Sequence, residues 1–356
     1  MINSIHIENF RGFESLDVGG FSKFNLVVGT IGVGKTSLLE ALLLARTAEP
    51  RVLATLDAQR GWQRQLARID TRGVWRYLFL DPNRPFVLDS AGDPNSVRVE
   101  AQFQPAGMYL YPGQAFPAEP GQADSTQPDL ATTPAEDLRW QFSVNGKLEA
   151  EALAQGTALG AVLRPVKQPT QKLPNKVAFV SQNTGIMAAL FESFSALKAA
   201  GAIAPFLAGL RVLVPWIEDV EIMADGGLTL AASGQDHRMV PLPLLGEGVM
   251  RLAQILLNVA YVDRGILLID EIERGFHHSV LPDIWRALRA AVGETDVQVF
   301  ATTHSYECIA AADAAFTDAP ADLALFRLQH VNGKLRAISY PPDVRSSSLE
   351  DGMEVR

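Results

Sequence analysis

The sequence predicts an α/β fold built around a parallel sheet, and three stretches carry that prediction. Residues 24–29 (FNLVVG) form a continuous apolar run, followed by a glycine-rich turn and then by leucines at helical spacing in residues 34–46. Residues 266–269 (ILLI) and 297–302 (VQVFAT) are further short apolar runs, typical of parallel strands that are buried on both faces. A strand, a turn and a helix in this order are what a parallel α/β sheet requires.

The other elements are predicted from periodicity and turn residues. Alternation of apolar and polar residues indicates strands, and Asn-Gly pairs between such runs indicate hairpins. Proline inside a helical pattern indicates a break. The predicted elements are, in order, a strand at 4–10, a hairpin at 140–148, a strand at 177–181, helix over 186–210 with a break near Pro205, a hairpin at 220–232, a loop and an apolar helix within 241–263, and a closing hairpin at 324–339.

We expect four segments. Residues 1–49 form an N-terminal lobe that carries the glycine-rich turn, and residues 175–342 form a C-terminal lobe of the same α/β unit. Between them, residues 50–174 are predicted to form an insertion that is partly disordered. It is arginine-rich over residues 50–80, and its proline- and glycine-rich stretch, from about 81 to 134, predicts a long excursion that is not part of the core. Residues 343–356, rich in serine and acidic residues and without periodicity, are expected to form a flexible tail.

Composition excludes several classes of protein. The chain has 31 Lys and Arg residues against 40 Asp and Glu, so bulk charge does not favour binding to nucleic acid or to anionic membranes. The single cysteine, Cys308, leaves no internal disulfide and no cysteine-based zinc site. The N-terminus lacks a long apolar stretch, and the most apolar long stretch, residues 186–216, contains charged side chains, so we expect a cytoplasmic protein without a membrane segment.

The glycine-rich turn has the pattern of a phosphate-binding loop. Residues 29–36 (GTIGVGKT) match G-x-x-x-x-G-K-[ST], the Walker A pattern, at every fixed position. Backbone N–H groups of such a loop cradle phosphates, the lysine reaches the β- and γ-phosphates, and the hydroxyl of the last residue ligates Mg²⁺. The predicted nucleotide-binding residues are Gly29, Thr30, Ile31, Gly32, Val33, Gly34, Lys35, Thr36 and Ser37.

Two neighbouring carboxylates follow the apolar run at 266–269. Beside a phosphate loop, Asp270 is expected to hold Mg²⁺ through water and Glu271 to polarise the attacking water, as the Walker B acids of a hydrolase. Taken alone, two acids also fit a plain boundary between a strand and a turn. ATP is favoured over GTP because the nearest match to a guanine-reading [NT]KxD motif, at 175–178, lacks the aspartate.

A histidine follows the next apolar run. His304 lies in the stretch TTHS directly after VQVFA, and a histidine just past a strand end can hydrogen-bond a γ-phosphate and report its presence. We therefore predict catalytic roles for Lys35, Glu271 and His304. A structural role for this histidine is the alternative.

Taken together, five stretches resemble the ABC-type AAA ATPases of the OLD-like group, which are similar to the heads of structural-maintenance-of-chromosomes and recombination-mediator ATPases. The resemblance covers the first 50 residues and roughly 175–340, and it implies a P-loop NTPase head with a mixed sheet core, antiparallel β hairpins and a helical signature region. The stretches are SIHIENFRGFESLDV, GTIGVGKTSLLEAL, LLGEGVMRLAQILLNVAY, GILLIDEIERGFHH and FATTHSYECI.

The resemblance also implies roles for residues outside these patterns. Arg11 matches an N-terminal arginine that lies near the nucleotide, and Gln182 is a candidate metal-sensing glutamine. Such heads carry a signature turn at the position of Gly246, Glu247 and Gly248. This turn binds the γ-phosphate of the ATP that is held by a second protomer, so two heads enclose two ATP molecules. A Gly-x-Gly turn that opens a helix presents free N–H groups to an anion, in agreement with this role. The expected metal ligands are Thr36, Asp270 and Gln182, and the expected cofactors are ATP and Mg²⁺.

OLD-like heads often carry or pair with a nuclease-type Toprim domain, frequently in antiphage or DNA-maintenance systems. About 50 residues follow His304, too few for such a domain, so we expect a separate effector protein. The predicted function is an ATP hydrolase that forms a homodimer on ATP and acts as a molecular switch. An ATP-switched nucleic-acid clamp with little turnover is the alternative.

Two further patterns remain open. Glu273, His277 and His278 could join Asp270 in a metal site, although adjacent histidines point in different directions, which favours structural or interface roles. A row of arginines at four-residue spacing, with tryptophans between them, could contact nucleic-acid phosphates; the alternative is a solvated face paired with the protein's own acids. The row consists of Arg60, Arg64, Arg68, Arg72 and Arg76, with Trp62 and Trp75.

Overall fold

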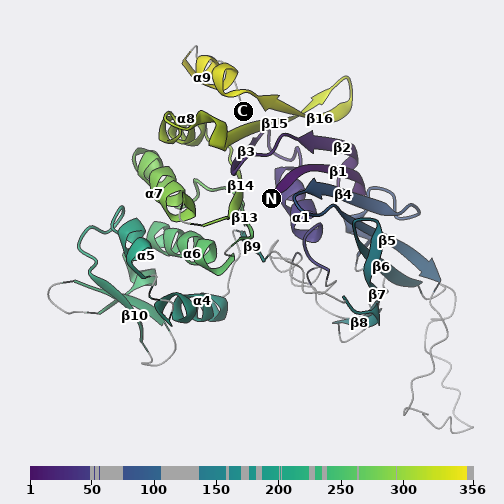
Figure 1. Ribbon diagram of the computed structural model, residues 1–356, viewed down its shortest axis with the longest axis horizontal. Helices are drawn as coiled ribbons and strands as arrows, with labels where there is room; N and C mark the ends of the chain where they lie inside the picture. Colours follow the sequence, from purple (N-terminus) through teal and green to yellow (C-terminus); the bar gives the residue numbers. More distant parts are fainter. Residues whose placement is uncertain are drawn as a thin grey trace, which may run out of the picture.

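Two large sheets and a helical layer form the molecule (Figure 1). The computed structural model describes residues 1–48, 52, 56, 75–105, 136–157, 160–169, 176–181, 187–199, 201, 203–223, 229–234, 239–262, 264–293 and 295–350. In Figure 1 the antiparallel sheet lies on the right, the helices α4 to α8 on the left, and the second sheet between them. The architecture is the mixed α/β head that the sequence predicts.

The central sheet has six strands in the order β16-β15-β3-β14-β13-β9. Five of them, from β15 to β9, run parallel, and β16 pairs antiparallel with β15 at the edge. The strands are β3 (Phe24–Val28), β9 (Val177–Val180), β13 (Ile266–Ile269), β14 (Gln298–Thr302), β15 (Leu323–Val331) and β16 (Lys334–Tyr340). The β15–β16 pair is the hairpin predicted around Asn332-Gly333.

Burial on both faces explains why the strand β13 is a continuous apolar run. Ile266 and Leu268 point into the core shared with the antiparallel sheet, and Leu267 and Ile269 point into the core under the helices. All four side chains are at most 1% exposed. At about 1.5–3 kcal/mol for each fully buried aliphatic side chain, these four residues fix β13 in the middle of the sheet.

Helix α1 (Lys35–Leu44) lies between the two sheets and contacts strands of both. The second core is covered by α7 (Leu281–Gly293) and α8 (Tyr306–Ala315). A third cluster joins α4 (Met187–Ala199), α5 (Ile203–Leu210) and α6 (Glu247–Val262) to a small sheet of β10 (Asp219–Met223), β11 (Thr229–Ser233) and β12 (Val240–Pro241). Within the described ranges, no helix combines the length and the apolar character that a bilayer crossing needs.

The antiparallel sheet corrects the prediction for the segment 50–174. Five of its seven strands come from that segment and pair with the N-terminal strands in the order β2-β1-β4-β5-β6-β7-β8. Phe86, Leu88 and Val99 are fully buried in its core face, so the stretch predicted as an excursion contributes strands to the core. The strands are β1 (Ile2–Phe10), β2 (Phe13–Gly19), β4 (Phe86–Gly92), β5 (Val97–Pro105), β6 (Glu136–Val144), β7 (Lys147–Thr157) and β8 (Gly160–Lys167).

The expected flexible tail is also corrected, because residues Pro342–Glu350 form helix α9. Arg345 on this helix is 1% exposed and its Nε donates to Asp313 Oδ1 of α8 at 2.6 Å. A buried guanidinium bound to a carboxylate anchors the helix to the domain, which serine-rich composition alone does not indicate. Residues 351–356 lie outside the described residues.

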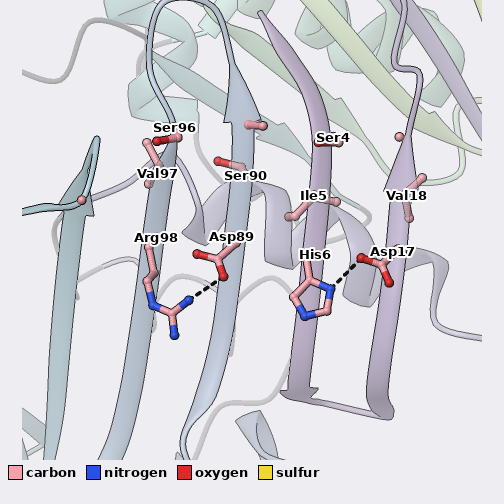
Figure 2. Close-up of a pocket in the computed structure, with 13 residues that line it drawn as sticks. Ser4, Ile5, His6, Asp17, Val18, Asp89, Ser90, Ser96, Val97 and Arg98 are labelled. Atoms are coloured by element: carbon pink, nitrogen blue, oxygen red, sulfur yellow. Dashed lines mark hydrogen bonds and ion pairs between the residues drawn. The ribbon is translucent and has the colours of Figure 1, made fainter.

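The open face of the antiparallel sheet carries a row of paired charges. Register places Asp17, His6, Asp89 and Arg98 side by side on β2, β1, β4 and β5 (Figure 2). His6 Nδ1 lies 2.6 Å from Asp17 Oδ1, and Arg98 Nη1 donates to Asp89 Oδ2 at 2.6 Å. These side chains line a hollow on the sheet, and within it they satisfy one another. We therefore interpret the row as stabilisation of the sheet.

This row predicts a pH-dependent contribution to stability. Burial lowers the pKa of His6, but the hydrogen bonds to Glu8 and Asp17 outweigh burial and raise that pKa above its ordinary value. Because the folded-state pKa is raised, the stabilisation is complete below the unfolded value of about 6.5 and is lost as pH rises through the folded-state pKa. Asp17→Asn should lower the His6 pKa in an NMR titration of the imidazole, with His6→Gln identifying the signal. An unchanged pKa in Asp17→Asn would show that the pair does not form in solution.

Candidate functional site

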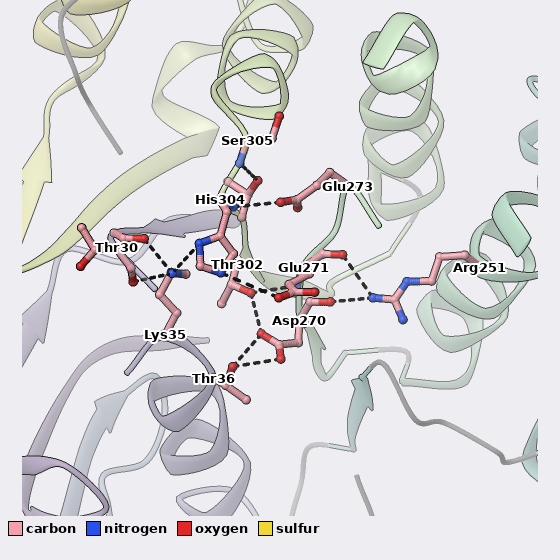
Figure 3. A network of polar contacts seen from close by, with 12 residues as sticks. Thr30, Lys35, Thr36, Arg251, Asp270, Glu271, Glu273, Thr302, His304 and Ser305 are labelled. Carbon is pink, nitrogen blue, oxygen red and sulfur yellow. Dashed lines mark hydrogen bonds and ion pairs between the residues drawn. The ribbon is translucent and has the colours of Figure 1, made fainter. Parts of the chain in front are cut away.

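The carboxyl ends of three neighbouring parallel strands bring the predicted site residues together (Figure 3). The phosphate loop (residues 29–36) follows β3, Asp270 follows β13, and His304 lies two residues after the end of β14. Ligands of open α/β sheets bind outside the carboxyl ends of the strands, because loops from neighbouring strands converge there. The three motifs, far apart in sequence, therefore form one site.

Tight packing fixes the turn from the phosphate loop into α1. Gly34 caps this helix with φ +108°, a backbone conformation that favours glycine. A Cβ atom at this position would lie 2.6 Å from the ring of Phe13, which is buried beneath the loop. Any side chain here would move the loop, so the fixed glycine of the pattern has a steric reason. At the opposite, outer side of the loop, Ile31 is 90% exposed.

Lys35 is a buried cation inside this loop. Its Nζ donates to the main-chain oxygens of Gly29 at 2.7 Å and Thr30 at 3.0 Å, and it lies 3.1 Å from His304 Nδ1. Burial lowers the pKa of Lys35 to about 8, against the opposing effect of the carboxylates of Asp270, Glu271 and Glu273. At neutral pH the group is therefore mainly charged and incompletely solvated, which is a favourable state for binding an anion.

The contact with Lys35 determines which nitrogen of His304 carries the proton. An ammonium group only donates hydrogen bonds, so Nδ1 of His304 accepts and the proton of a neutral ring lies on Nε2. That Nε2 is 3.8 Å from Glu271 Oε1. The imidazole therefore lies between the buried cation and the carboxylate, with its N–H directed to the side where Glu271 lies.

Thr36 and Asp270 form an oxygen cluster suited to a small divalent cation. Thr36 Oγ1 lies 3.1 and 3.0 Å from the two carboxylate oxygens of Asp270, and Thr302 Oγ1 donates to Asp270 Oδ1 at 2.7 Å. Neighbouring oxygen ligands of an octahedral Mg²⁺ at about 2.1 Å from the metal are separated by about 3 Å. The threonine and aspartate oxygens therefore lie close enough to hold one Mg²⁺ together, Thr36 as a ligand and Asp270 through water.

The backbone of Glu271 is held in an unusual conformation. Its φ is +50°, which costs a non-glycine residue on the order of 1–3 kcal/mol. The strain is held from one side by Thr302 Oγ1, which accepts from the N–H of Glu271 at 2.8 Å. Such outliers cluster at functional sites, so this one supports a role for the carboxylate that follows the metal ligand.

Arg251 of α6 holds the same strand end from the other side. Its Nη1 donates to the main-chain oxygen of Ser181 at 2.8 Å and its Nη2 to that of Asp270 at 2.6 Å. Burial lowers the pKa of Arg251 to about 10, so the group stays charged at neutral pH. The side chain thereby ties α6 to the ends of both β9 and β13.

The predicted signature turn, residues 246–248, opens α6 and lies next to the turn that follows Asp270. Glu247 Oε1 is 3.6 Å from Arg274 Nε, and a Cβ atom added to Gly248 would lie 2.7 Å from the main-chain oxygen of Gly275. Gly248 therefore has a packing role within the same chain. Gly246 and Glu247 are exposed, as a surface that binds a second protomer requires.

The remaining predicted site residues lie apart from this cluster or outside the described residues. Arg11 contacts α1, but its guanidinium is bound to Glu40, with Nε donating to Oε2 at 2.9 Å; its proximity to a nucleotide stays a prediction. Gln182 lies outside the described residues, as does the arginine row apart from Arg76. Trp75 is 3% exposed in the core, so it does not serve as a surface for stacking bases.

The structure favours the structural interpretation of the two histidines. His277 Nδ1 accepts from the N–H of Ser279 at 3.3 Å, and the rings of His277 and His278 lie 4.1 Å apart. Among the described residues, no group of three or more His, Cys, Asp and Glu side chains is arranged to hold a metal ion. The hypothesis of a metal site with Glu273 is therefore not supported in this part of the chain.

Sequence reasoning missed two residues of the site. Thr302 was part of the quoted TTHS stretch, and its place at the end of a strand was a usable signal. Arg251 lies in a largely apolar helix, where a single arginine at a core-facing position is the signal that was available. Both act through contacts with Asp270, so their roles become visible only in three dimensions.

Family models and known proteins match parts of this chain. Residues 1–83 match the family described as "AAA ATPase domain", and residues 230–310 match "AAA domain, putative AbiEii toxin, Type IV TA system". An ATP/GTP phosphatase of Helicobacter pylori is 40% identical over 52 residues, which is 14% of this chain and 14% of that protein. An uncharacterized protein of Methanocaldococcus jannaschii is 35% identical over 68 residues, 17% of this chain and 31% of that protein. The chain thus spans less than a third of the length of either relative.

The fold is similar to that of a solved head domain. An Smc head domain with an extended coiled coil, bound to the C-terminal domain of ScpA and derived from Pyrococcus furiosus, superimposes with a TM-score of 0.51 at 11% identity, covering 98% of both chains. The first family match contains the phosphate loop, and the second contains the acids and His304. The two segments that match AAA domain models therefore meet in one site, on a fold similar to that of an Smc head domain.

Proposed function

We propose that the chain binds and hydrolyses Mg·ATP at the carboxyl ends of β3, β13 and β14, forms a head-to-head homodimer on ATP, and signals this state to a separate effector. The observation that carries the proposal is the convergence of Lys35, Thr36, Asp270 and His304 around one strand edge. A cation, a pair of metal-ligand oxygens and a carboxylate beside them are the parts that phosphoryl transfer requires.

Each residue has a chemical task in this proposal. Lys35 binds phosphate oxygens, and Thr36 and Asp270 hold Mg²⁺, with Gln182 as a further candidate ligand. When bound, Mg²⁺ neutralises charge on the phosphate oxygens. Glu271 accepts a proton from the attacking water, whose oxygen forms a bond to the γ-phosphorus while the bond to the bridging oxygen breaks, giving ADP and phosphate. His304 donates from Nε2 to the γ-phosphate and so reports its presence.

The dimer follows from the signature turn. Gly246 and Glu247 are exposed at the start of α6, where the N–H groups of the first helical turn and the helix dipole attract an anion. In our proposal, this turn binds the γ-phosphate of ATP held by a second copy. Hydrolysis then opens the dimer, and this change of state is what a nuclease-type effector detects, in antiphage defence or DNA maintenance.

An exposed leucine beside the signature turn provides a test of the dimer. Leu244 is 76% exposed, so Leu244→Glu should leave the monomer folded and still able to bind ATP. In a head-to-head dimer the added carboxylate would be buried near phosphates, and we expect ATP-dependent dimers to be reduced at least about tenfold. Light scattering after gel filtration with a non-hydrolysable ATP analogue measures this.

The matched control is Val166→Glu on β8, an apolar residue that is 57% exposed in the antiparallel sheet. This variant should dimerise like the wild type. If Leu244→Glu also dimerises normally, the signature face is not the interface. If the wild type stays monomeric with the analogue, the dimer itself is ruled out. The proposal of ATP hydrolysis is tested separately, by measuring the release of phosphate from ATP.

A further inference from the structure

Glu273, three residues after Asp270, makes a contact that the roles above do not use. Its Oε1 accepts a hydrogen bond from the backbone N–H of His304 at 2.9 Å (Figure 3). Its other oxygen, Oε2, is buried and has no hydrogen-bond partner among the residues that the structure describes. A buried acceptor without a partner costs about 1–3 kcal/mol, so the position of this carboxylate needs an explanation beyond stability.

The backbone that carries Glu273 is firmly anchored. The N–H of Ile272 donates to the main-chain oxygen of Thr302 at 3.0 Å, and the Ile272 side chain is 1% exposed. The N–H of Phe276 in turn donates to the main-chain oxygen of Glu273 at 3.1 Å. The turn after β13 is thus fixed to the end of β14, and the carboxylate reaches across from one strand end to the loop of the next.

The loop that carries His304 is short and is held on both sides of the histidine. Thr303 donates its N–H to Val27 O at 3.2 Å, and Ser305 caps α8 by accepting from the N–H of Cys308 at 3.0 Å. Between these two anchors, the N–H of His304 is the donor that Glu273 satisfies. Fixing this N–H fixes the backbone from which the imidazole ring projects to Lys35 and Glu271.

We propose that Glu273 is a positioning residue for His304: its carboxylate holds the His304 backbone so that the ring lies between the Lys35 ammonium and the Glu271 carboxylate. This inference rests on the proposed ATP hydrolysis, in which His304 contacts the γ-phosphate. Glu273 itself touches neither nucleotide nor water in this role. Its effect on turnover passes through the histidine, because displacing a reacting group by about 1 Å can cost about a hundredfold in rate.

Two substitutions at this position separate the hydrogen bond from the charge. Glu273→Ala removes the acceptor, and we expect kcat to fall roughly tenfold to a hundredfold with KM little changed. Glu273→Gln keeps an oxygen that accepts from the His304 N–H, so it should recover most of the lost rate. The matched control is Glu218→Ala, which removes an exposed acid on the segment before β10.

A double mutant tests whether the effect passes through the histidine. If it does, Glu273→Ala combined with His304→Ala should be no slower than His304→Ala alone. Multiplicative losses, or equal rates for Glu273→Ala and the wild type, would overturn the inference. If Glu273→Ala only destabilises the fold, its melting temperature will be lowered. In that case the rate of Glu273→Gln is compared with that of the wild type instead.

A second readout does not depend on turnover. In protein without nucleotide, the ring ¹⁵N and ¹H shifts of His304 report the tautomer with the proton on Nε2, and they should change in Glu273→Ala but persist in Glu273→Gln. Unchanged shifts in Glu273→Ala would refute positioning, whatever the rate. If the wild type hydrolyses no ATP while the shifts change, the positioning role stands and the proposed function fails.

Discussion

Lys35→Ala is expected to weaken ATP binding by at least about a hundredfold, which corresponds to roughly 2.7 kcal/mol. The wild-type ammonium is buried inside the phosphate loop and is held there by the main-chain oxygens of Gly29 and Thr30. A charge-assisted contact to phosphate in such a site is stronger than one in water, because the surroundings screen it less. Isothermal titration with ATP and Mg²⁺ measures the loss.

The matched control for this experiment is Lys334→Ala, which removes an exposed lysine of the edge strand β16. The affinity of Lys334→Ala for ATP should equal that of the wild type. A titration in which Lys35→Ala binds ATP as tightly as the wild type would reject the phosphate-loop interpretation, and with it the proposed site.

The same lysine gives a pH signature. Because burial lowers the pKa of Lys35 to about 8, the free protein is mainly charged at this position below pH 8 and loses the charge above it. Phosphate binding favours the charged form, so above pH 8 binding requires uptake of a proton and affinity falls by up to about tenfold per pH unit. Lys35→Arg keeps its charge in this range and should show a flat profile, although its affinity can differ in absolute terms.

Much of this site could be predicted from sequence because its parts are local patterns. The phosphate loop is one contiguous motif, and Asp270, Glu271 and His304 each stand directly behind an apolar run. Parallel strands place their carboxyl ends at one edge of the sheet. A motif that directly follows each of several such strands is therefore expected to lie close to the others. The contacts of Lys35 with His304 and of Thr36 with Asp270 confirm that expectation of convergence.

The supporting residues could not be predicted in this way. Arg251 lies in a helix whose neighbours are apolar, and nothing in the local pattern shows that its guanidinium reaches the ends of two strands. Glu273 was interpreted as a candidate metal ligand because acids and histidines are adjacent there in sequence. Its actual partner is a backbone N–H 31 positions away, which only the pairing of β13 with β14 brings close.

The composition of the middle of the chain led to a wrong prediction, because it averaged over strands and the proline-rich segments between them. The proline- and glycine-rich sequence between residues 81 and 134 suggested an excursion, yet β4 and β5 lie within it, with buried residues that alternate at the start of β5 and are consecutive at the start of β4. Strand signals of period two are short and are easily outweighed by neighbouring prolines. The Asn145-Gly146 turn was found because a hairpin turn is specified by two residues alone.

Glu271→Gln is expected to reduce ATP hydrolysis by roughly a hundredfold to ten-thousandfold while ATP binding is retained. The amide has nearly the shape of the carboxylate but cannot accept the proton of the attacking water. The backbone at this position is fixed by the contacts of its N–H with Thr302 and of the preceding carbonyl with Arg251. The substituted side chain should therefore stay in place, so the loss can be assigned to chemistry.

Single-turnover release of phosphate measures the chemical step, and light scattering in the presence of ATP measures the dimer. If hydrolysis opens the dimer, Glu271→Gln should accumulate dimers with ATP itself, whereas the wild type should return to monomers as ATP is consumed. Glu218→Gln, the same chemical change on an exposed acid before β10, should behave as the wild type in both assays. Normal turnover in Glu271→Gln would rule out Glu271 as the general base. Slow turnover without an accumulation of dimers would show that hydrolysis does not depend on dimer formation, because the site would then work in a single head.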